Sequence, residues 1–350
     1  MARRLVDEQL IDDTELDPHP DVAAPQRKDS AAVSRRPAGL LSAGDVALFS
    51  RRTNTAGALY FVCHYMLIGV GAWLVARTFG SAAFWPVFAT HAFIISFLFS
   101  PLHECAHGAA FRARWLNESV LWITAFVYIV PPYYFRYFHL GHHRYTQVPG
   151  KDPSLVLPEP ATFAQYVWYC AGLWFWWRNL SWMVKHAAGL SHPMSSSYVP
   201  ESRRGAMVVE ARTLCLLYAS VALASVYFGF AFELFICWLA PRFVGEPVQR
   251  ILRVAEHVGC DESPNLLKNT RTTCTNWLIS ALAWQMPYHA EHHLFPNVPF
   301  HALPALHQAI GHQVTVEPHG YLSGQRRIIK ALWVGTGRRS SVGQTPGPLL

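Results

Sequence analysis

The chain has 350 residues, of which 51% are hydrophobic and only 15% are charged. Charged residues make up roughly 25% of an ordinary soluble protein, so the composition indicates a membrane protein rather than a soluble protein with a large core. The net charge is +7, but Lys and Arg flank apolar runs instead of forming one basic patch. This placement is typical of membrane topology signals and argues against nucleic acid as a partner.

Residues 1–52 mix acidic, basic, Pro and Ser residues without periodicity, which predicts a disordered cytoplasmic tail. The two runs that follow, 53–76 and 78–103, contain no Asp, Glu, Lys or Arg. Each is longer than the roughly 20 apolar residues that a membrane-spanning helix needs, and their short connection predicts a helical hairpin. His64 and His91 lie inside these runs, where we expect core histidines bonded to a neighbouring helix.

Three further apolar segments complete the predicted topology. Residues 119–135 contain Pro131-Pro132 near their end and are marginally short for a span, so we interpret them as a re-entrant or interfacial helix. Residues 161–177 are rich in Trp and Tyr, which favours the headgroup level, with a true span as the alternative. Residues 207–248 are long enough for two helices that turn near Gly229. The prediction is an all-α, multi-pass integral membrane protein with about four transmembrane helices and a cytoplasmic helical cap.

Histidines cluster at three places at the polar ends of these segments. One pair is separated by four positions in HECAH, and the pattern H-x-x-H-H occurs twice, as HLGHH and HAEHH. On a helix this spacing places the imidazoles on one face, and imidazole suits iron, zinc, copper or nickel. Eight imidazoles are more than one metal ion needs and match two ions with open positions. The candidate ligands, which are also the candidate catalytic residues, are His103, His107, His139, His142, His143, His289, His292 and His293.

A nitrogen-ligated iron pair can bind O₂ and, after two-electron reduction, remove hydrogen from an unactivated C–H bond. A lipid chain in the bilayer would lie just beneath such a site. His103-Glu104-x-x-His107 alone also matches a zinc metalloprotease, with Glu104 as general base. A non-catalytic metal-binding membrane protein is a further alternative. Glu104 and Glu291 stand between candidate ligands, where they either orient imidazole N–H groups or face solvent.

The order and spacing of HECAH, HLGHH and HAEHH resemble the membrane fatty acid desaturase and hydroxylase superfamily. The segment from Thr146 to Asp152-Pro153, the run Asn269-Thr270-Arg271-Thr272 and residues 287–296 resemble it as well. The likeness covers roughly residues 55–310 and is greatest to bacterial single-domain fatty acid desaturase and hydrocarbon oxygenase members.

The resemblance implies a di-iron centre, O₂ as co-substrate, and a separate electron donor, ferredoxin or a cytochrome b5-like protein. The eight histidines above would be iron ligands, and His257 would supply one more metal ligand. The implied reaction is fatty acid desaturation, which introduces a C=C bond, with a lipid or carotenoid hydroxylase or ketolase as the alternative.

The resemblance, the composition of the chain ends and the placement of basic residues together predict the organisation of the chain. We expect a membrane desaturase-like domain over residues 53–312 and a flexible C-terminal tail over residues 313–350. The expected location is the bacterial inner membrane, with the active site facing the cytoplasm.

Overall fold

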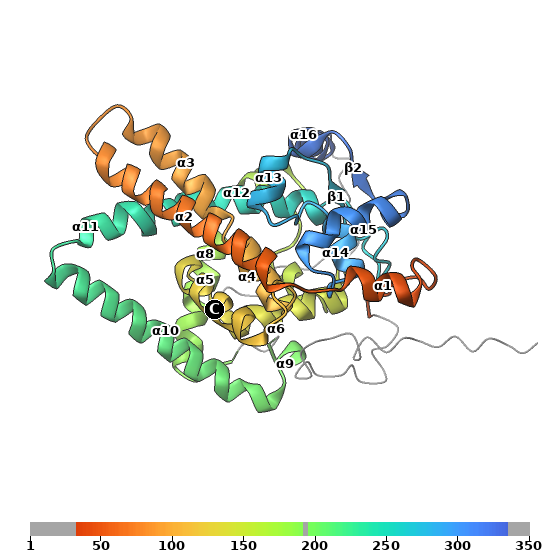
Figure 1. Ribbon diagram of the computed structural model, residues 1–350, viewed down its shortest axis with the longest axis horizontal. Helices are drawn as coiled ribbons and strands as arrows, with labels where there is room; N and C mark the ends of the chain where they lie inside the picture. Colours follow the sequence, from red (N-terminus) through yellow and green to blue (C-terminus); the bar gives the residue numbers. More distant parts are fainter. Residues whose placement is uncertain (1–32, 192–194, 335–350) are drawn as a thin grey trace, which may run out of the picture.

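The computed structural model describes residues 33–191 and 195–334, and nearly all regular structure within them is helical. Figure 1 shows helices α2, α3, α10 and α11 extending to one end of the long axis, away from α14–α16 at the other. The elements in chain order are α1 (Ala43–Phe49), α2 (Asn54–Thr78), α3 (Phe84–Ser96), α4 (Phe99–Ala106), α5 (Arg114–Tyr128), α6 (Pro132–Tyr145), η2 (Pro153–Val156), α7 (Phe163–Ala171), α8 (Leu173–Ala187), α9 (Ser195–Tyr198), α10 (Glu201–Tyr227), α11 (Ala231–Leu234), η3 (Phe235–Leu239), α12 (Ala240–His257), β1 (Thr272–Thr273), α13 (Trp277–Leu282), α14 (His289–Leu294), η4 (Phe300–Ala302), α15 (Leu303–Ile310), η5 (Gly311–Gln313), β2 (Val316–Glu317) and α16 (Gly320–Trp333).

Three helical segments among the described residues are long and apolar enough to cross a membrane: α2, the α3–α4 segment Phe84–Ala106, and α10. Large apolar side chains on them are widely exposed, and Met66, Trp73, Leu223 and Val226 are each more than half exposed. Water disfavours such continuous apolar surface, whereas lipid tails solvate it. These segments therefore form the lipid-facing part of a mostly helical membrane protein.

Residues 207–248 contain one sharp turn near the position predicted. Helix α10 ends at Tyr227, and Gly229 follows with φ of 76°, a left-handed conformation that favours glycine. The returning path runs through α11, the π-helical segment η3, and α12. Its start lies beside the α2–α3 turn (Figure 1), where the rings of Phe79 and Phe232 are 4.8 Å apart. Both hairpin turns thus lie at the same end of the molecule.

Helix α12 and the preceding η3 pack closely on α3. A Cβ atom at Gly245 would lie 2.3 Å from the carbonyl oxygen of Ala92, so only glycine allows this approach. His91 Nε2 lies 2.8 Å from the carbonyl oxygen of Cys237, and His64 Nε2 lies 3.3 Å from that of Ile94 on α3. Both histidines are buried, so the prediction that they are core residues bonded to a neighbouring helix is confirmed.

The two remaining apolar runs are divided by backbone turns. Helix α5 ends at Tyr128, Ile129 adopts a left-handed φ of 64°, and α6 begins at Pro132. Proline suits the first helical turn, because it needs no N–H partner there. Residues 161–177 divide similarly at Gly172, where φ is 72° between α7 and α8. Neither run is among the described helices long and apolar enough to cross a membrane.

The expectation of a disordered tail over residues 1–52 is wrong for its last third. Helix α1 begins at a capping box, in which Ser42 and Asp45 each bond to the other's backbone N–H. Upstream, Arg35 forms a parallel bridge with Asn265, and the Arg36 guanidinium lies 4.4 Å from the ring centre of Phe295. These contacts order residues 33–52, while residues 1–32 lie outside the described part of the chain.

The expectation of a flexible tail over residues 313–350 is likewise wrong for residues 313–334. Strand β2 pairs in parallel with β1, aligning Thr272 with Val316. Helix α16 buries Ile328 and Leu332 against Val254 of α12. Burial of such side chains stabilises a docked helix, which explains why this segment folds. Residues 335–350 lie outside the described residues.

Candidate metal centre

Nine histidines from four helices converge in the folded chain. Helix α4 and its C-terminal cap supply two, α6 supplies three, α14 supplies three, and the last residue of α12 supplies one. Eight of the nine are buried, and His143 is partly buried. The structure therefore brings together all the metal ligands that the sequence predicted: His103, His107, His139, His142, His143, His257, His289, His292 and His293.

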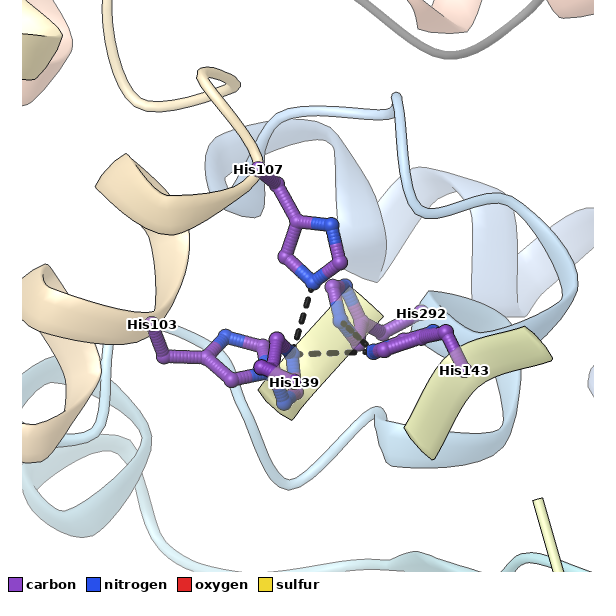
Figure 2. Close-up of side chains that lie close together, drawn as sticks. All are labelled: His103, His107, His139, His143 and His292. Carbon is purple, nitrogen blue, oxygen red and sulfur yellow. Dashed lines mark hydrogen bonds between the residues drawn. The ribbon is translucent and has the colours of Figure 1, made fainter. Parts of the chain in front are cut away.

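The first histidine group comprises His103, His107, His139, His143 and His292, one potential ligand nitrogen of each lying within 4.8 Å of all the others. Figure 2 shows these imidazoles pointing toward one another from three separate helices. Contacts between Nε2 atoms link them in a chain. The His107–His139 distance is 2.8 Å, the His139–His143 distance is 3.0 Å and the His143–His292 distance is 3.2 Å.

The second histidine group comprises His142, His257, His289 and His293, again within 4.8 Å. His289 Nε2 lies 2.9 Å from His257 Nε2 and 3.0 Å from His293 Nε2. The ring of His293 stacks on that of His143 at 4.0 Å between centres. This stacking joins the second group directly to the first.

Each H-x-x-H-H box is shared between the two groups. On α6, His139 and His143 belong to the first group and His142 to the second; on α14, His292 belongs to the first, and His289 and His293 to the second. Positions i and i+4 lie on one side of a helix, while i+3 is rotated away from i+4. One short helix can thus supply ligands to two neighbouring ions.

Several of the imidazoles are held neutral. Burial is the largest cause that lowers the pKa of His139, His143, His289 and His293 well below the ordinary value, and repulsion from neighbouring imidazoles adds to it. Burial likewise lowers the pKa of His292 to about 3. A neutral imidazole retains a nitrogen lone pair, which is the form that binds a metal ion.

The nitrogen contacts fit bound metal better than hydrogen bonding alone. Both ring nitrogens of His103 are buried without a hydrogen-bond partner among the described residues, although one must carry a proton. His139 Nε2 faces two other Nε2 atoms at once. Lone pairs directed at one another repel unless a proton or a cation lies between them. The donor set of nine imidazoles therefore suits two transition-metal ions.

Several contacts outside the groups fix the imidazole orientations. His142 Nδ1 lies 3.0 Å from both carboxylate oxygens of buried Asp152. A carboxylate only accepts, so Nδ1 carries the proton and Nε2 keeps its lone pair. His257 Nδ1 lies 3.3 Å from the carbonyl oxygen of Asn269, and His293 Nδ1 lies 3.1 Å from the Thr146 hydroxyl. Such contacts raise ligand basicity and set the tautomer.

The two acidic residues between the ligands differ in role, and the alternative that they face solvent is wrong because both are buried. Glu104 Oε1 lies 3.6 Å from His103 Nδ1 and 3.9 Å from His292 Nδ1, beside two candidate ligands. Glu291 instead accepts from Thr272 and lies 2.5 Å from Nδ1 of His307, which belongs to neither group. Glu291 therefore ties α14 to α15 and β1 rather than orienting a ligand.

A cavity adjoins the first histidine group. Phe99 and Phe135 line it and also contact the histidines, since the Phe135 ring stacks on His139 at 5.6 Å and the Phe99 ring lies 5.7 Å from His103. The remaining wall comes mostly from α6, α8 and α12, with contributions from α5 and α7, and is largely aromatic. The cavity thus reaches the first histidine group through aromatic side chains.

Sequence reasoning did not assign the supporting residues. Asp152 and Thr146 were visible only as part of a resemblance after the second box, and Asn269 as part of a later run. Their signal was the polar turn that follows HLGHH, which holds an acidic residue beside a proline. The contact between this turn and His142 depends on tertiary structure, so spacing alone does not reveal it.

Comparison with known proteins identifies the class. The profile described as fatty acid desaturase matches residues 79–324, and the chain belongs to this family. It is 22% identical over 275 residues to sphingolipid delta(4)-desaturase DES1 of Homo sapiens, covering 75% of this chain and 76% of the relative. It is 25% identical over 277 residues to human sphingolipid delta(4)-desaturase/C4-monooxygenase DES2, covering 75% of each. It is 23% identical over 300 residues to fatty acid conjugase FAC2 B of Calendula officinalis, covering 73% of this chain and 77% of the relative.

The family and the apolar helices agree. The protein is a membrane oxidoreductase of the fatty acid desaturase family, acting on lipid or acyl substrates, with two histidine groups that could hold metal.

Proposed function

We propose that the protein is a di-iron oxidase that desaturates a lipid acyl chain, introducing a C=C bond with O₂ as co-substrate. The observation that carries this proposal is the pair of adjoining histidine groups, buried beside an aromatic cavity. Membership of the fatty acid desaturase family supports it.

The two histidine groups would each hold one iron ion, with the five imidazoles of the first group and the four of the second as ligands. Iron in such sites activates O₂ for hydrogen removal from unactivated C–H bonds. These imidazoles are the catalytic residues of the proposal.

The chain's own residues prepare this chemistry. Asp152 holds the Nδ1 proton of His142, so that Nε2 points into the second group. Phe99 and Phe135 bring apolar surface against His103 and His139, which excludes water and positions a methylene segment there. Desaturation reduces O₂ to two molecules of water, taking two electrons and two protons from the chain. Two further electrons and protons must be supplied, and we assign the electrons to a separate ferredoxin or cytochrome b5-like donor.

The membrane arrangement follows from the same proposal. We assign residues 53–312, together with the docked residues 33–52 and 313–334, to a desaturase-like domain with about four crossings, three being the apolar segments above. The fourth is α11 with η3 and the start of α12, because this path returns alongside α3. The histidine groups then face the cytoplasm in a helical cap, and the membrane is the bacterial inner membrane.

Hydroxylation of the chain is the second candidate function. The name of the relative DES2 joins desaturase and C4-monooxygenase activities in one protein, and the same ligands can support either outcome. A carotenoid hydroxylase or ketolase belongs to this candidate. The zinc protease reading of His103-Glu104-x-x-His107 is not favoured, since both histidines lie in a group of five imidazoles, whereas a catalytic zinc site uses three protein ligands.

Lipid analysis of cells that express the chain tests the proposal. Expression under air should yield a new unsaturated or hydroxylated acyl product, and this product should be missing without O₂. His292→Ala should lower bound metal and abolish the product while leaving membrane insertion intact. His312→Ala, at an exposed histidine outside both groups, should behave as wild type. Normal turnover by His292→Ala would remove the site assignment.

A further inference from the structure

The cavity beside the first histidine group contains two arginines without anionic partners. Arg178 of α8 and Arg253 of α12 both line it. In the described part of the chain, neither guanidinium has an ion pair or hydrogen bond, and their contacts are with rings. Arg178 lies 5.1 Å from the centre of Phe138, and Arg253 lies 5.6 Å from that of Phe99.

A third arginine of the same cavity, Arg250, is paired with a carboxylate, unlike Arg178 and Arg253. Arg250 Nε lies 2.5 Å from Glu246 Oε1, and Arg242 Nη2 lies 2.9 Å from Glu246 Oε2. One carboxylate therefore serves two guanidinium groups and leaves no charge for the others. Glu256 acts on Arg253 electrostatically but makes no ion pair with it within 4 Å among the described residues. The cavity carries an excess of positive charge.

The free donors are partly desolvated. Burial is the largest cause that lowers the pKa of Arg178, and Arg250 and Arg253 add repulsion. Trp174 also lines the cavity, and its indole N–H is buried without a hydrogen-bond acceptor among the described residues. Guanidinium and indole N–H groups donate and do not accept. Leaving such groups buried and unpaired costs free energy, so the cavity is complementary to a ligand that brings acceptor oxygens and negative charge.

Arg253 also connects the cavity to the histidines. Its guanidinium lies against Phe99, and the Phe99 ring also neighbours His103 of the first group. A ligand on Arg253 is therefore one aromatic ring away from the candidate metal centre. Its apolar part would lie against the aromatic walls formed by α6 and α8.

We propose that this cavity binds an acyl substrate with an anionic head, a carboxylate or a phosphate, through Arg178 and Arg253. The proposal rests on the proposed function, because it names the substrate class of that site. A neutral hydroxyl head would satisfy some donors but leave both charges uncompensated. Charge-assisted hydrogen bonds to guanidinium are stronger than neutral ones, so the anionic head sets the preference.

Direct binding to the iron-loaded protein in nanodiscs of neutral phosphatidylcholine tests this proposal. The probes are radiolabelled octadecanoate, octadecyl phosphate and methyl octadecanoate, the last being neutral with the same chain. The acid or the phosphate should bind roughly tenfold or more tightly than the ester, and comparison of the two identifies the head group. Arg178→Gln and Arg253→Gln should each lose this preference, Arg253→Lys should keep most of it, and Arg326→Gln, at an exposed arginine, should keep all of it.

Three results would overturn the proposal. One is equal affinity for the ester and both anions, and another is an unchanged preference in both Gln variants. The third is found with nanodiscs that contain anionic phosphatidylglycerol. There the two arginines would bind the membrane lipid, and the acyl probes would show no preference for an anionic head. Iron content and O₂-dependent product are measured on the same samples. In the wild-type protein, the absence of a head-group preference with intact oxidation refutes only this proposal. A head-group preference in wild type without iron or oxidation refutes the proposed function.

Discussion

Replacing Asp152 with Asn tests how the chain holds its candidate metal centre. The buried carboxylate of Asp152 accepts from three donors: Nδ1 of His142, the backbone N–H of Gln147 at 2.9 Å and that of Ser154 at 2.8 Å. An amide offers one acceptor oxygen and one NH₂ group. In Asp152→Asn, at least one donor therefore faces an NH₂ group, and the charge that fixes the His142 tautomer is lost.

The expected loss is moderate and measurable. Removing the partner of a ligating histidine lowers metal affinity roughly 10- to 100-fold, which corresponds to about 1.4 to 2.7 kcal/mol. Because His142 is one of only four imidazoles in the second histidine group, the metal ion bound there should be the one that is held less tightly. The first group lacks His142 and should keep its metal.

Metal competition with a chelator measures this effect. We expect one of two metal ions to be released at a lower chelator concentration in Asp152→Asn, with the other unchanged. Asp45→Asn, at an exposed carboxylate of α1, is the matched control. Chelator curves that coincide for wild type and Asp152→Asn would refute the reasoning.

Four other predictions follow from the described contacts. Asp152 also predicts acid sensitivity, because its contacts with His142 outweigh the effect of burial and lower the pKa of its carboxyl group. The stabilisation from the ionised carboxylate is therefore present above about pH 4 and is lost as the pH falls through the lower pKa of the folded state. The acid side of the unfolding profile should flatten in Asp152→Asn. Gly245→Ala should destabilise the protein by about 1–3 kcal/mol, because the added Cβ meets the carbonyl oxygen of Ala92. Gly205→Ala on α10, which has open space around it, should not lower the melting temperature. Equal melting temperatures for wild type and Gly245→Ala would contradict the close α3–α12 contact. The hydrogen bond to Glu291 raises the pKa of His307. Wild type should therefore be more stable than Glu291→Gln below about pH 6.5, and this difference should shrink as the pH rises through the pKa of His307 in the folded state. A difference in melting temperature that stays constant with pH would contradict this prediction. Epitopes inserted after residues 150 and 312 should be accessible from the same side of the membrane, and opposite sides would break the shared site.

The histidine boxes could be predicted because their signal is local. The i, i+3 and i+4 spacing in HLGHH and HAEHH acts within one helical turn, so the ligands were recognisable before any tertiary contact was known. His257 was assigned through resemblance alone, and its neighbours in space, His289 and His293, come from a distant helix. The division of each box between two groups depends on how α6 faces α14, which spacing does not encode.

The ends of the domain were predicted less well for a related reason. Residues 33–52 and 313–334 lack a long apolar run, so composition favoured flexible tails. Their order comes from a few contacts with distant partners, such as Arg36 with Phe295 and Tyr166 with Gln325 at 2.9 Å. Similarly, the unpaired state of Arg178 and Arg253 is a property of the packed cavity. In the sequence they look like ordinary basic residues near a membrane surface.

The metal content of the detergent-purified protein tests the central claim most directly. We predict about two irons per chain by elemental analysis, with one ligand set per histidine group. His142→Ala should lose at least the iron of the second group, while His312→Ala should retain both. A single zinc per chain, or an iron content that His142→Ala leaves unchanged, would contradict the account.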